Sequence, residues 1–202
     1  MTIVFNGKAH SSSFQIFFCS CSRSMICHMP FILAIGDIPK PFEDTGSLAI
    51  TRFFNSKLLR ISCEEHPNNF LSEFENRNEI VQLIGDAAIS NSLGGSWLES
   101  LGDWQKPVIL LASPASSGHI PGTVSAHVSL CKRYSVPLVG IIQLGGEWDS
   151  RRRSLDCLPW CGFIPSELLK KDFNWESASF DEVFLLEDIY INLKKTISFF
   201  NL

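Results

Sequence analysis

Five short, uninterrupted apolar runs constrain the fold of this chain more than any other feature. They are "TIVF", "PFILAIG", "EIVQLIG", "PVILLAS" and "PLVGIIQL", and each is followed by a turn-rich loop and a longer mixed segment. Continuous apolar runs are typical of strands that are covered on both faces, as in a parallel sheet. The runs therefore predict an α/β fold with three layers and a mostly parallel central sheet. We expect its strands to begin near Ile3, Phe31, Ile80, Val108 and Leu138.

Helices are predicted between and after these runs. In "GTVSAHVSLCKRYSV", the spacing of Val124, Val128 and Cys131 predicts a helix over about 122–134 that packs onto the sheet. The tail "FDEVFLLEDIYINLKKTISFF" has the pattern of an amphipathic helix, with acids early and lysines late, as the helix dipole favours. The polar segment 43–78 is interpreted as helices with a loop excursion.

Length, charge and hydropathy favour one domain and argue against nucleic-acid and membrane partners. A chain of 202 residues with 45% apolar residues can bury one substantial core, so we expect a single domain over 1–202. A formal net charge of -4 argues against a nucleic-acid partner. No apolar run reaches the roughly 18 residues of a membrane span, and no basic segment leads into a signal core. We therefore expect a soluble, cytoplasmic protein without a membrane partner.

The seven cysteines are an odd number and are scattered, which indicates reduced thiols in a cytoplasm. Cys19, Cys21, Cys27 and His28 could be drawn as a zinc site, but no second paired unit accompanies them. Buried free thiols are the preferred interpretation, so no structural metal is expected. The basic run at residues 151–153 is interpreted first as a solvated loop and second as an anion clamp.

The first candidate loop is "NGKAHSSSF", which follows the first apolar run. Ligands of open α/β sheets lie beyond the carboxyl ends of the strands, and small residues there leave backbone amides free for a phosphate. The motif G-x-x-x-x-G-K-[ST] would need Gly, Lys and Thr where Ser13, Phe14 and Gln15 stand. Lys8 could supply the missing charge, although a solvated lysine on a turn is the alternative. The candidate binding residues are Gly7, Ser11, Ser12 and Ser13.

Three later loops are further candidates. Gly94 and Gly95 in "SNSLGGSW" permit a close backbone approach, or simply a turn. The hydroxyls and amides of "SPASSGH" could meet an oxyanion, or serve as turn and cap residues. Gly162 and Pro165 in "CGFIP" bracket a rigid apolar corner that could face an adenine ring or be a packed turn.

With its loops in this order, the chain resembles the dethiobiotin synthetases, ATP-dependent ligases of biotin synthesis with a P-loop-type parallel sheet. The best part of the match is "LGGSWLESLGDWQKPVILLASPASSGHIPGTVSAHVSLCKRYSVPLVGIIQL". "CGFIP" is similar to the family's Gly-x-Ile-Pro element near the adenine, and "MPFILAIGD" and "EDTGS" resemble weakened forms of two further segments. The resemblance implies a P-loop NTPase-like fold, ATP and magnesium as cofactors, and a homodimer.

The chain departs from the family at charged positions. Phe14 and Gln15 replace the P-loop Lys and Thr, and Asn91 replaces a magnesium-binding Glu. The family's magnesium-binding Asp falls on Gly46, which makes the nearby Asp44 the candidate metal ligand, with Asp37 and Glu43 as alternatives. Met29 stands where a Lys precedes Pro30, and Gln143 replaces the adenine-reading Asn. The matching positions mainly shape the backbone: Gly7, Gly94, Gly95, Gly118, Gly162 and Pro165.

Family members form a carbamate from a diamine and carbon dioxide, phosphorylate it with ATP and magnesium, and close a ureido ring. Each step develops negative charge, and loss of one stabilising group costs about 3 to 4 kcal/mol. We therefore expect a dethiobiotin-synthetase-like protein whose ATP and magnesium site is weakened or lost, and which binds a nucleotide, a small molecule or a protein without catalysis. The alternative is a working, divergent enzyme that uses Lys8 for phosphate.

Overall fold

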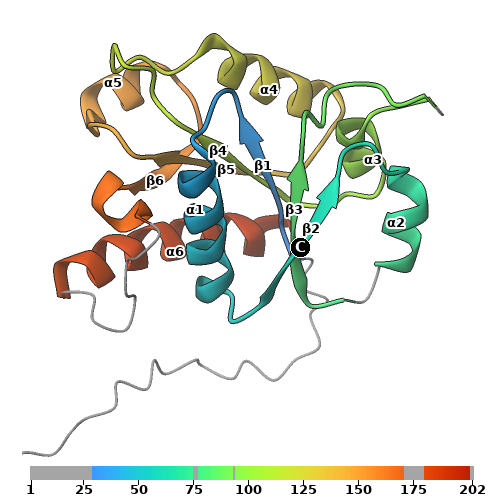
Figure 1. Ribbon diagram of the computed structural model, residues 1–202, viewed down its shortest axis with the longest axis horizontal. Coiled ribbons are helices and arrows are strands. Elements are labelled where there is room, and N and C mark those ends of the chain that lie inside the picture. Colours follow the sequence, from blue (N-terminus) through green and yellow to red (C-terminus); the bar gives the residue numbers. More distant parts are fainter. Residues whose placement is uncertain (1–28, 75–76, 93, 171–179, 201–202) are drawn as a thin grey trace, which may run out of the picture.

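A computed structural model of the chain describes residues 29–74, 77–92, 94–170 and 180–200 (Figure 1). Strands and helices alternate along these residues. The strands are β1 (Phe31–Ile35), β2 (Lys57–Ser62), β3 (Glu79–Ile84), β4 (Val108–Ala112), β5 (Leu138–Leu144) and β6 (Trp160–Ile164). The helices are α1 (Lys40–Phe53), α2 (Pro67–Glu73), α3 (Trp97–Asp103), α4 (Gly122–Arg133), α5 (Ser150–Leu155) and α6 (Phe180–Phe200), with a 3₁₀ turn η1 (Ser166–Leu169).

The six described strands form one sheet in the order β2-β3-β1-β4-β5-β6, and every neighbouring pair is parallel. Parallel neighbours need a crossover connection, and helices supply it between successive strands. The predicted α/β fold with a parallel central sheet is therefore confirmed.

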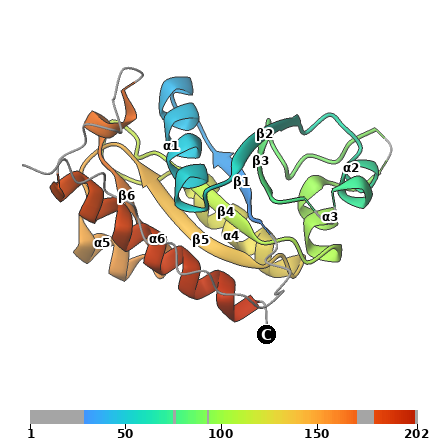
Figure 2. The ribbon, with the colours of Figure 1, turned by 90° about the horizontal axis from the view of Figure 1, so that it is seen from below.

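Each face of the sheet has its own apolar core, because successive side chains of a strand point to opposite faces. In β1, Phe31 and Leu33 pack with residues of α2, α3 and α4, whereas Ile32 packs with residues of α1 and α6. Figure 2 shows α6 running along β5 and β6, while α2 and α3 lie at the β2 and β3 end of the sheet. The helices thus form two layers around the sheet.

Four of the predicted strands are confirmed, as β1, β3, β4 and β5, and the one expected near Ile3 lies outside the described residues. Two strands were missed. Segment 43–78 contains helical residues as expected, but also β2, a half-buried edge strand whose sequence KLLRIS interrupts its apolar residues with charges. "CGFIP" was interpreted as a corner, yet its first residues belong to β6, which pairs with β5.

The two predicted helices are confirmed. In α4, Val124 and Cys131 are fully buried and Val128 is partly buried against the same core. The predicted tail helix is α6, whose Ile189 and Leu193 are buried. No helix in the described ranges is both long enough and apolar enough to cross a bilayer.

Candidate functional site

The chain leaves β1 and β4 in opposite directions along the sheet, so the carboxyl ends of these adjacent strands are a topological switch point. From β1 it passes beyond β3 to the edge strand β2, whereas from β4 it continues to β5 on the other side. Ligands of open α/β sheets bind at such a point. Gly36 follows β1 there with a φ of 78°, and a Cβ on it would lie 3.5 Å from Oγ1 of Thr123 in α4. The candidate site is therefore built from the loop after β1 and the start of α4.

The loop after β1 offers few backbone donors to a phosphate. It leads into α1, where Pro39 is the N-cap residue and Pro41 lies in the first turn, and proline has no N–H group. The amides of Phe42 and Glu43 both donate to the carbonyl of Pro39, at 2.8 and 3.1 Å. A phosphate-binding loop needs several free amides that converge on one point. This loop lacks that arrangement.

The charges at the start of α1 are paired with one another and with the sheet. Glu43 accepts hydrogen bonds from Nε2 of Gln82 at 2.6 Å and from Nζ of Lys40 at 3.2 Å. Asp44 pairs with Arg60 at 3.1 Å and with Lys40 at 3.5 Å. Asp44, the predicted metal ligand, thus lies among cations. Among the described residues, no group of three or more His, Cys, Asp or Glu side chains is placed to hold a metal ion.

Side chains fill the sheet edge beyond β4 and β5. Ring atom Cε2 of Phe42 lies 2.7 Å from the position that a Cβ on Gly145 would occupy. Pro114, which follows β4, packs in the same way against Gly146. Gly145 and Gly146 have φ angles of 68° and 69°, the left-handed region that favours glycine. The start of α1 and the loops after β4 and β5 are therefore packed directly against one another.

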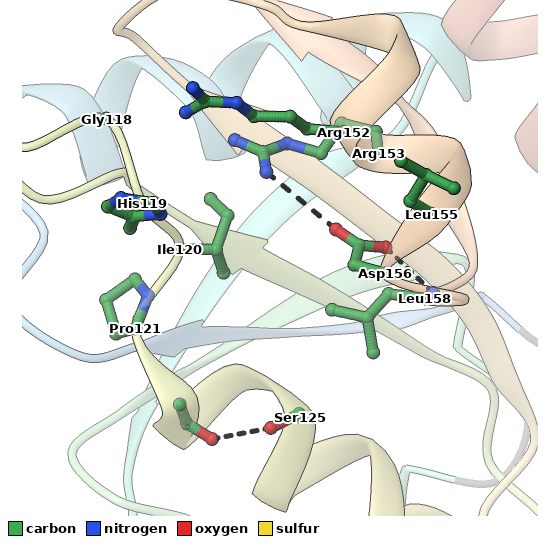
Figure 3. Close-up of a pocket in the computed structure, with 11 residues that line it drawn as sticks. Gly118, His119, Ile120, Pro121, Ser125, Arg152, Arg153, Leu155, Asp156 and Leu158 are labelled. Carbon is green, nitrogen blue, oxygen red and sulfur yellow. Dashed lines mark hydrogen bonds and ion pairs between the residues drawn. The ribbon is translucent and has the colours of Figure 1, made fainter.

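A cavity of about 450 Å³ lies beside this edge, between the loop that enters α4 and helix α5 (Figure 3). Its volume falls in the range of small-molecule sites. It is lined by Gly118, His119, Ile120, Pro121, Gly122, Ser125, Arg152, Arg153, Leu155, Asp156 and Leu158. The cavity therefore combines two guanidinium groups with an apolar wall.

Arg153 is the most buried charged group of this cavity, with 7% of its surface exposed. Its Nε donates to Oε1 of Gln143 at 3.0 Å, and its Nη1 lies 3.8 Å from Oδ2 of Asp156. Its Cζ stands 5.1 Å from the ring centroid of Trp160, a cation–π contact. Arg153 is thus held in place by residues from β5, β6 and the end of α5.

Gln143, the predicted adenine-reading residue, is fully buried in β5. Its Nε2 donates to the carbonyls of Gly145 and Glu147, at 2.9 and 3.1 Å, while its Oε1 accepts from Arg153. The amide therefore ties the loop after β5 to helix α5, and both its donor and its acceptor are already used.

The predicted pair, Gly94 and Gly95, lies directly before the N-cap residue of α3. Gly94 and Gly95 have φ angles of 92° and 78°, and the amide of Asn91 donates to the carbonyl of Gly95 at 2.9 Å. Ser96 follows as the N-cap residue of α3 and forms a capping box with Glu99. In the described structure the pair thus makes a turn before a capped helix.

Gly162 lies within β6 and not at a corner. A Cβ on it would stand 2.6 Å from Cγ1 of Ile189, so glycine allows α6 to approach the sheet closely. Pro165 is the N-cap residue of η1. Both residues therefore have a packing role in the described structure, whether or not a ligand also contacts them.

Asp37, the alternative metal ligand, is exposed in the loop after β1. Eleven other predicted residues lie outside the described ranges: Gly7, Lys8, Ser11, Ser12, Ser13, Phe14, Gln15, Cys19, Cys21, Cys27 and His28. The four described cysteines, Cys63, Cys131, Cys157 and Cys161, are free thiols. Burial raises the pKa of Cys63 to about 12, with Asp86 adding to the effect, and it raises the pKa values of Cys131 and Cys161 to about 11. These three thiols are therefore protonated at neutral pH.

Two parts of this site were missed from the sequence. In the loop after β1, only Asp37 was predicted, as an alternative metal ligand, and the prolines of "GDIPKP" that remove backbone donors were not considered. The burial of Arg153 was missed because the arginine run was interpreted first as a solvated loop. No family model and no curated protein sequence matches this chain. The geometry of the described residues is therefore what bears on its function.

Proposed function

We propose that this chain is a dethiobiotin-synthetase-like protein with P-loop NTPase kinship, whose ATP and magnesium site is weakened or lost, and which works as a non-catalytic binding or interaction module. The observation that carries the proposal is the packing of Phe42 against Gly145 at the carboxyl edge of the sheet. An aromatic ring at the first turn of α1 thus lies at the carboxyl edge of the sheet, where ligands of open α/β sheets bind.

The local charges support the same proposal. A triphosphate needs converging amides, a cation and a divalent metal ion. At the start of α1, prolines remove amides and Glu43 adds a carboxylate. Lys40, the cation nearest this loop in sequence, already pairs with Glu43 and Asp44. These features disfavour a bound triphosphate.

Calorimetric titration with ATP and magnesium tests the proposal. We expect no binding tighter than about 1 mM, and no phosphate release with a diamine substrate and bicarbonate. Phe42→Ala is the informative variant, because removing the ring opens the edge; it should bind ATP more tightly than the unmodified chain, and unchanged binding would show that the ring does not close the edge.

The alternative, a working divergent synthetase, makes the opposite prediction. Micromolar binding of ATP that weakens in Lys8→Ala, together with turnover, would overturn the proposed loss of the site. Lys57→Ala is the matched control. Lys57 is the first residue of the edge strand β2, so it lies at the end of the strand opposite to the carboxyl edge of the sheet. Binding that depends on Lys8 and not on Lys57 would assign Lys8 the phosphate role.

We further propose that the chain is a cytoplasmic homodimer that pairs through the outer face of α4. Over its first turns the exposed side chains Thr123, Ser125, Ala126 and Ser129 are small, so a second helix can approach closely there, whereas Lys132 and Arg133 are exposed in its last turn. Light scattering coupled to gel filtration should give twice the mass of one chain. Ala126→Arg should convert the dimer to a folded monomer, whereas a monomeric unmodified chain would contradict this interface.

A further inference from the structure

The cavity between α4 and α5 contains a buried cation whose charge is incompletely compensated. Arg153 has only one acidic partner in the described structure, Asp156, and the separation is 3.8 Å. The carboxylate of Asp156 also accepts a hydrogen bond from Nε1 of Trp160 at 3.0 Å. A buried guanidinium is favourable only when its charge is well paired. The ion pair between Arg153 and Asp156 is therefore long, and Asp156 divides its carboxylate between Arg153 and Trp160.

Arg152 brings a second guanidinium group to the same space. Its Nε pairs with Oδ2 of Asp149 at 3.1 Å, and no contact of its terminal amino groups is found among the described residues. Figure 3 shows both guanidinium groups extending from α5 toward the loop that carries Gly118 and His119. Asp156 is the sole carboxylate among the lining residues. With Asp149 counted, the two guanidinium groups face two aspartates, and the terminal amino groups of Arg152 remain as donors for an anion.

Apolar side chains line the cavity on both sides (Figure 3). They are Ile120 and Pro121 on the way into α4, and Leu155 and Leu158 beside and after the arginines. Leu155 is 72% exposed. A ligand that covers Leu155 would gain from removing its apolar surface from water.

We propose that this cavity binds a small organic anion, whose phosphate or carboxylate head lies between Arg152 and Arg153 and whose apolar body lies against Ile120 and Leu155. Guanidinium groups bind both head groups through paired N–H donors, and the volume of about 450 Å³ fits a molecule of this size. The site goes beyond the proposed function, because it shares no lining residue with the loop after β1. Its test and the ATP titration can therefore fail independently.

The first experiment is a titration followed by calorimetry and by tryptophan fluorescence, since Trp160 contacts Arg153. The probes are phenyl phosphate, benzoate and benzyl alcohol, which share an apolar ring and differ in the head group. We expect the anions to bind at about 1 mM or tighter and the neutral alcohol not to bind. Tighter binding of phenyl phosphate assigns a phosphate head, and tighter binding of benzoate assigns a carboxylate. Equal binding of all three probes, or of none at about 10 mM, would overturn the proposal.

The second experiment compares two neighbouring arginines. Arg152→Gln should weaken binding of the preferred anion by about tenfold, because a charge-assisted pair is lost. Arg151→Gln is the matched control, since Arg151 is exposed on the same helix but does not line the cavity. It should change the affinity by less than about twofold. Equal weakening by the two variants would show a non-specific effect of net charge and would refute the site.

Arg153 needs a conservative change, because it is buried. Arg153→Lys keeps the charge but loses the planar pair of donors, so we expect about fivefold weaker binding while the unfolding transition remains cooperative. Unchanged affinity in a folded Arg153→Lys protein would remove Arg153 from the site. Leu155→Ala, at an exposed position, should weaken the binding of phenyl phosphate without loss of stability, and unchanged affinity there would contradict the apolar contact.

Discussion

The ring of Phe42 and the backbone of Gly145 are in contact across the carboxyl edge of the sheet, where ring atom Cε2 lies 2.7 Å from the position of a Cβ on Gly145. This contact joins the first turn of α1 to the loop after β5, two segments that are far apart in the sequence. It keeps the left-handed backbone of Gly145 beneath an aromatic ring. The shape of this edge depends on it.

Gly145→Ala should lower the free energy of unfolding by about 3 kcal/mol. The left-handed backbone costs an alanine about 1 to 2 kcal/mol, and the clash with Phe42 adds a similar amount. Urea denaturation measures the change. Gly118→Ala is the control, because Gly118 has a φ of 76° but nothing lies within 4 Å of its added Cβ, so it should cost only about 1 to 2 kcal/mol. Equal losses in the two variants would show that the contact with Phe42 is not tight.

Gln143→Met should destabilise the protein by about 2 to 3 kcal/mol, although the side chain keeps its size. The change leaves two backbone carbonyls and the Nε of Arg153 without the partners that Gln143 provides. The effect should be smaller in an Arg153→Met background, since that donor is already gone. A double-mutant cycle measured by chemical denaturation gives the coupling, and strict additivity would contradict the network.

The buried thiols predict a loss of stability at alkaline pH. The pKa of Cys131 rises from 9.0 to about 11 on burial. Between these values the unfolded chain releases the thiol proton and the folded chain keeps it, so the free energy of unfolding falls by up to about 1.4 kcal/mol per pH unit. The stability that this protonated thiol provides is thus complete below pH 9 and is lost as the pH rises through about 11.

Cys131→Ala tests this linkage. The variant should be less stable at pH 8, because a small cavity forms, and the difference from the unmodified protein should shrink as the pH rises from 9 to 11. Denaturation curves at four pH values in this window suffice. A difference that stays constant would mean that Cys131 does not titrate differently in the two states.

Cys157 should react with a maleimide much faster than Cys131 or Cys161 in the folded protein. Cys157 is exposed, whereas the other two thiols are buried and have raised pKa values. Peptide mapping by mass spectrometry after a short reaction at pH 7.5 locates the label. Cys157→Ser should remove that one label and leave the rest of the map unchanged. Rapid labelling of Cys131 without denaturant would contradict its burial.

The central part of the fold was predictable, since β1, β4 and β5 are covered on both faces and are therefore continuously apolar. The edge strand β2 was not predictable. Its outer side pairs with no described strand, so charged residues are tolerated there, and Lys57 and Arg60 interrupt its apolar pattern. The strand β6 was missed because Gly162 suggested a turn, while the real reason for that glycine is the closeness of Ile189 on α6. Such a contact between distant segments leaves no local signal.

The sequence indicated where in the fold a site should lie, but it did not indicate which residues form it. The rule that ligands lie beyond the carboxyl ends of strands pointed to this edge, and the loop of "SPASSGH" does lead to the cavity. The role of Arg153 depends on Gln143 and Trp160, which come from two different strands. Only the folded arrangement shows that one arginine of the run is buried and its neighbours are exposed.

Helix α6 has a consequence for how the chain acquires its structure during synthesis. Its Leu186, Ile189, Leu193 and Ile197 are buried on one face of the sheet, against residues of β5, β6 and α1. That apolar surface stays uncovered until residues up to 197 have left the ribosome. This face of the sheet can therefore be covered only after translation of this helix, and until then its apolar residues are exposed to water.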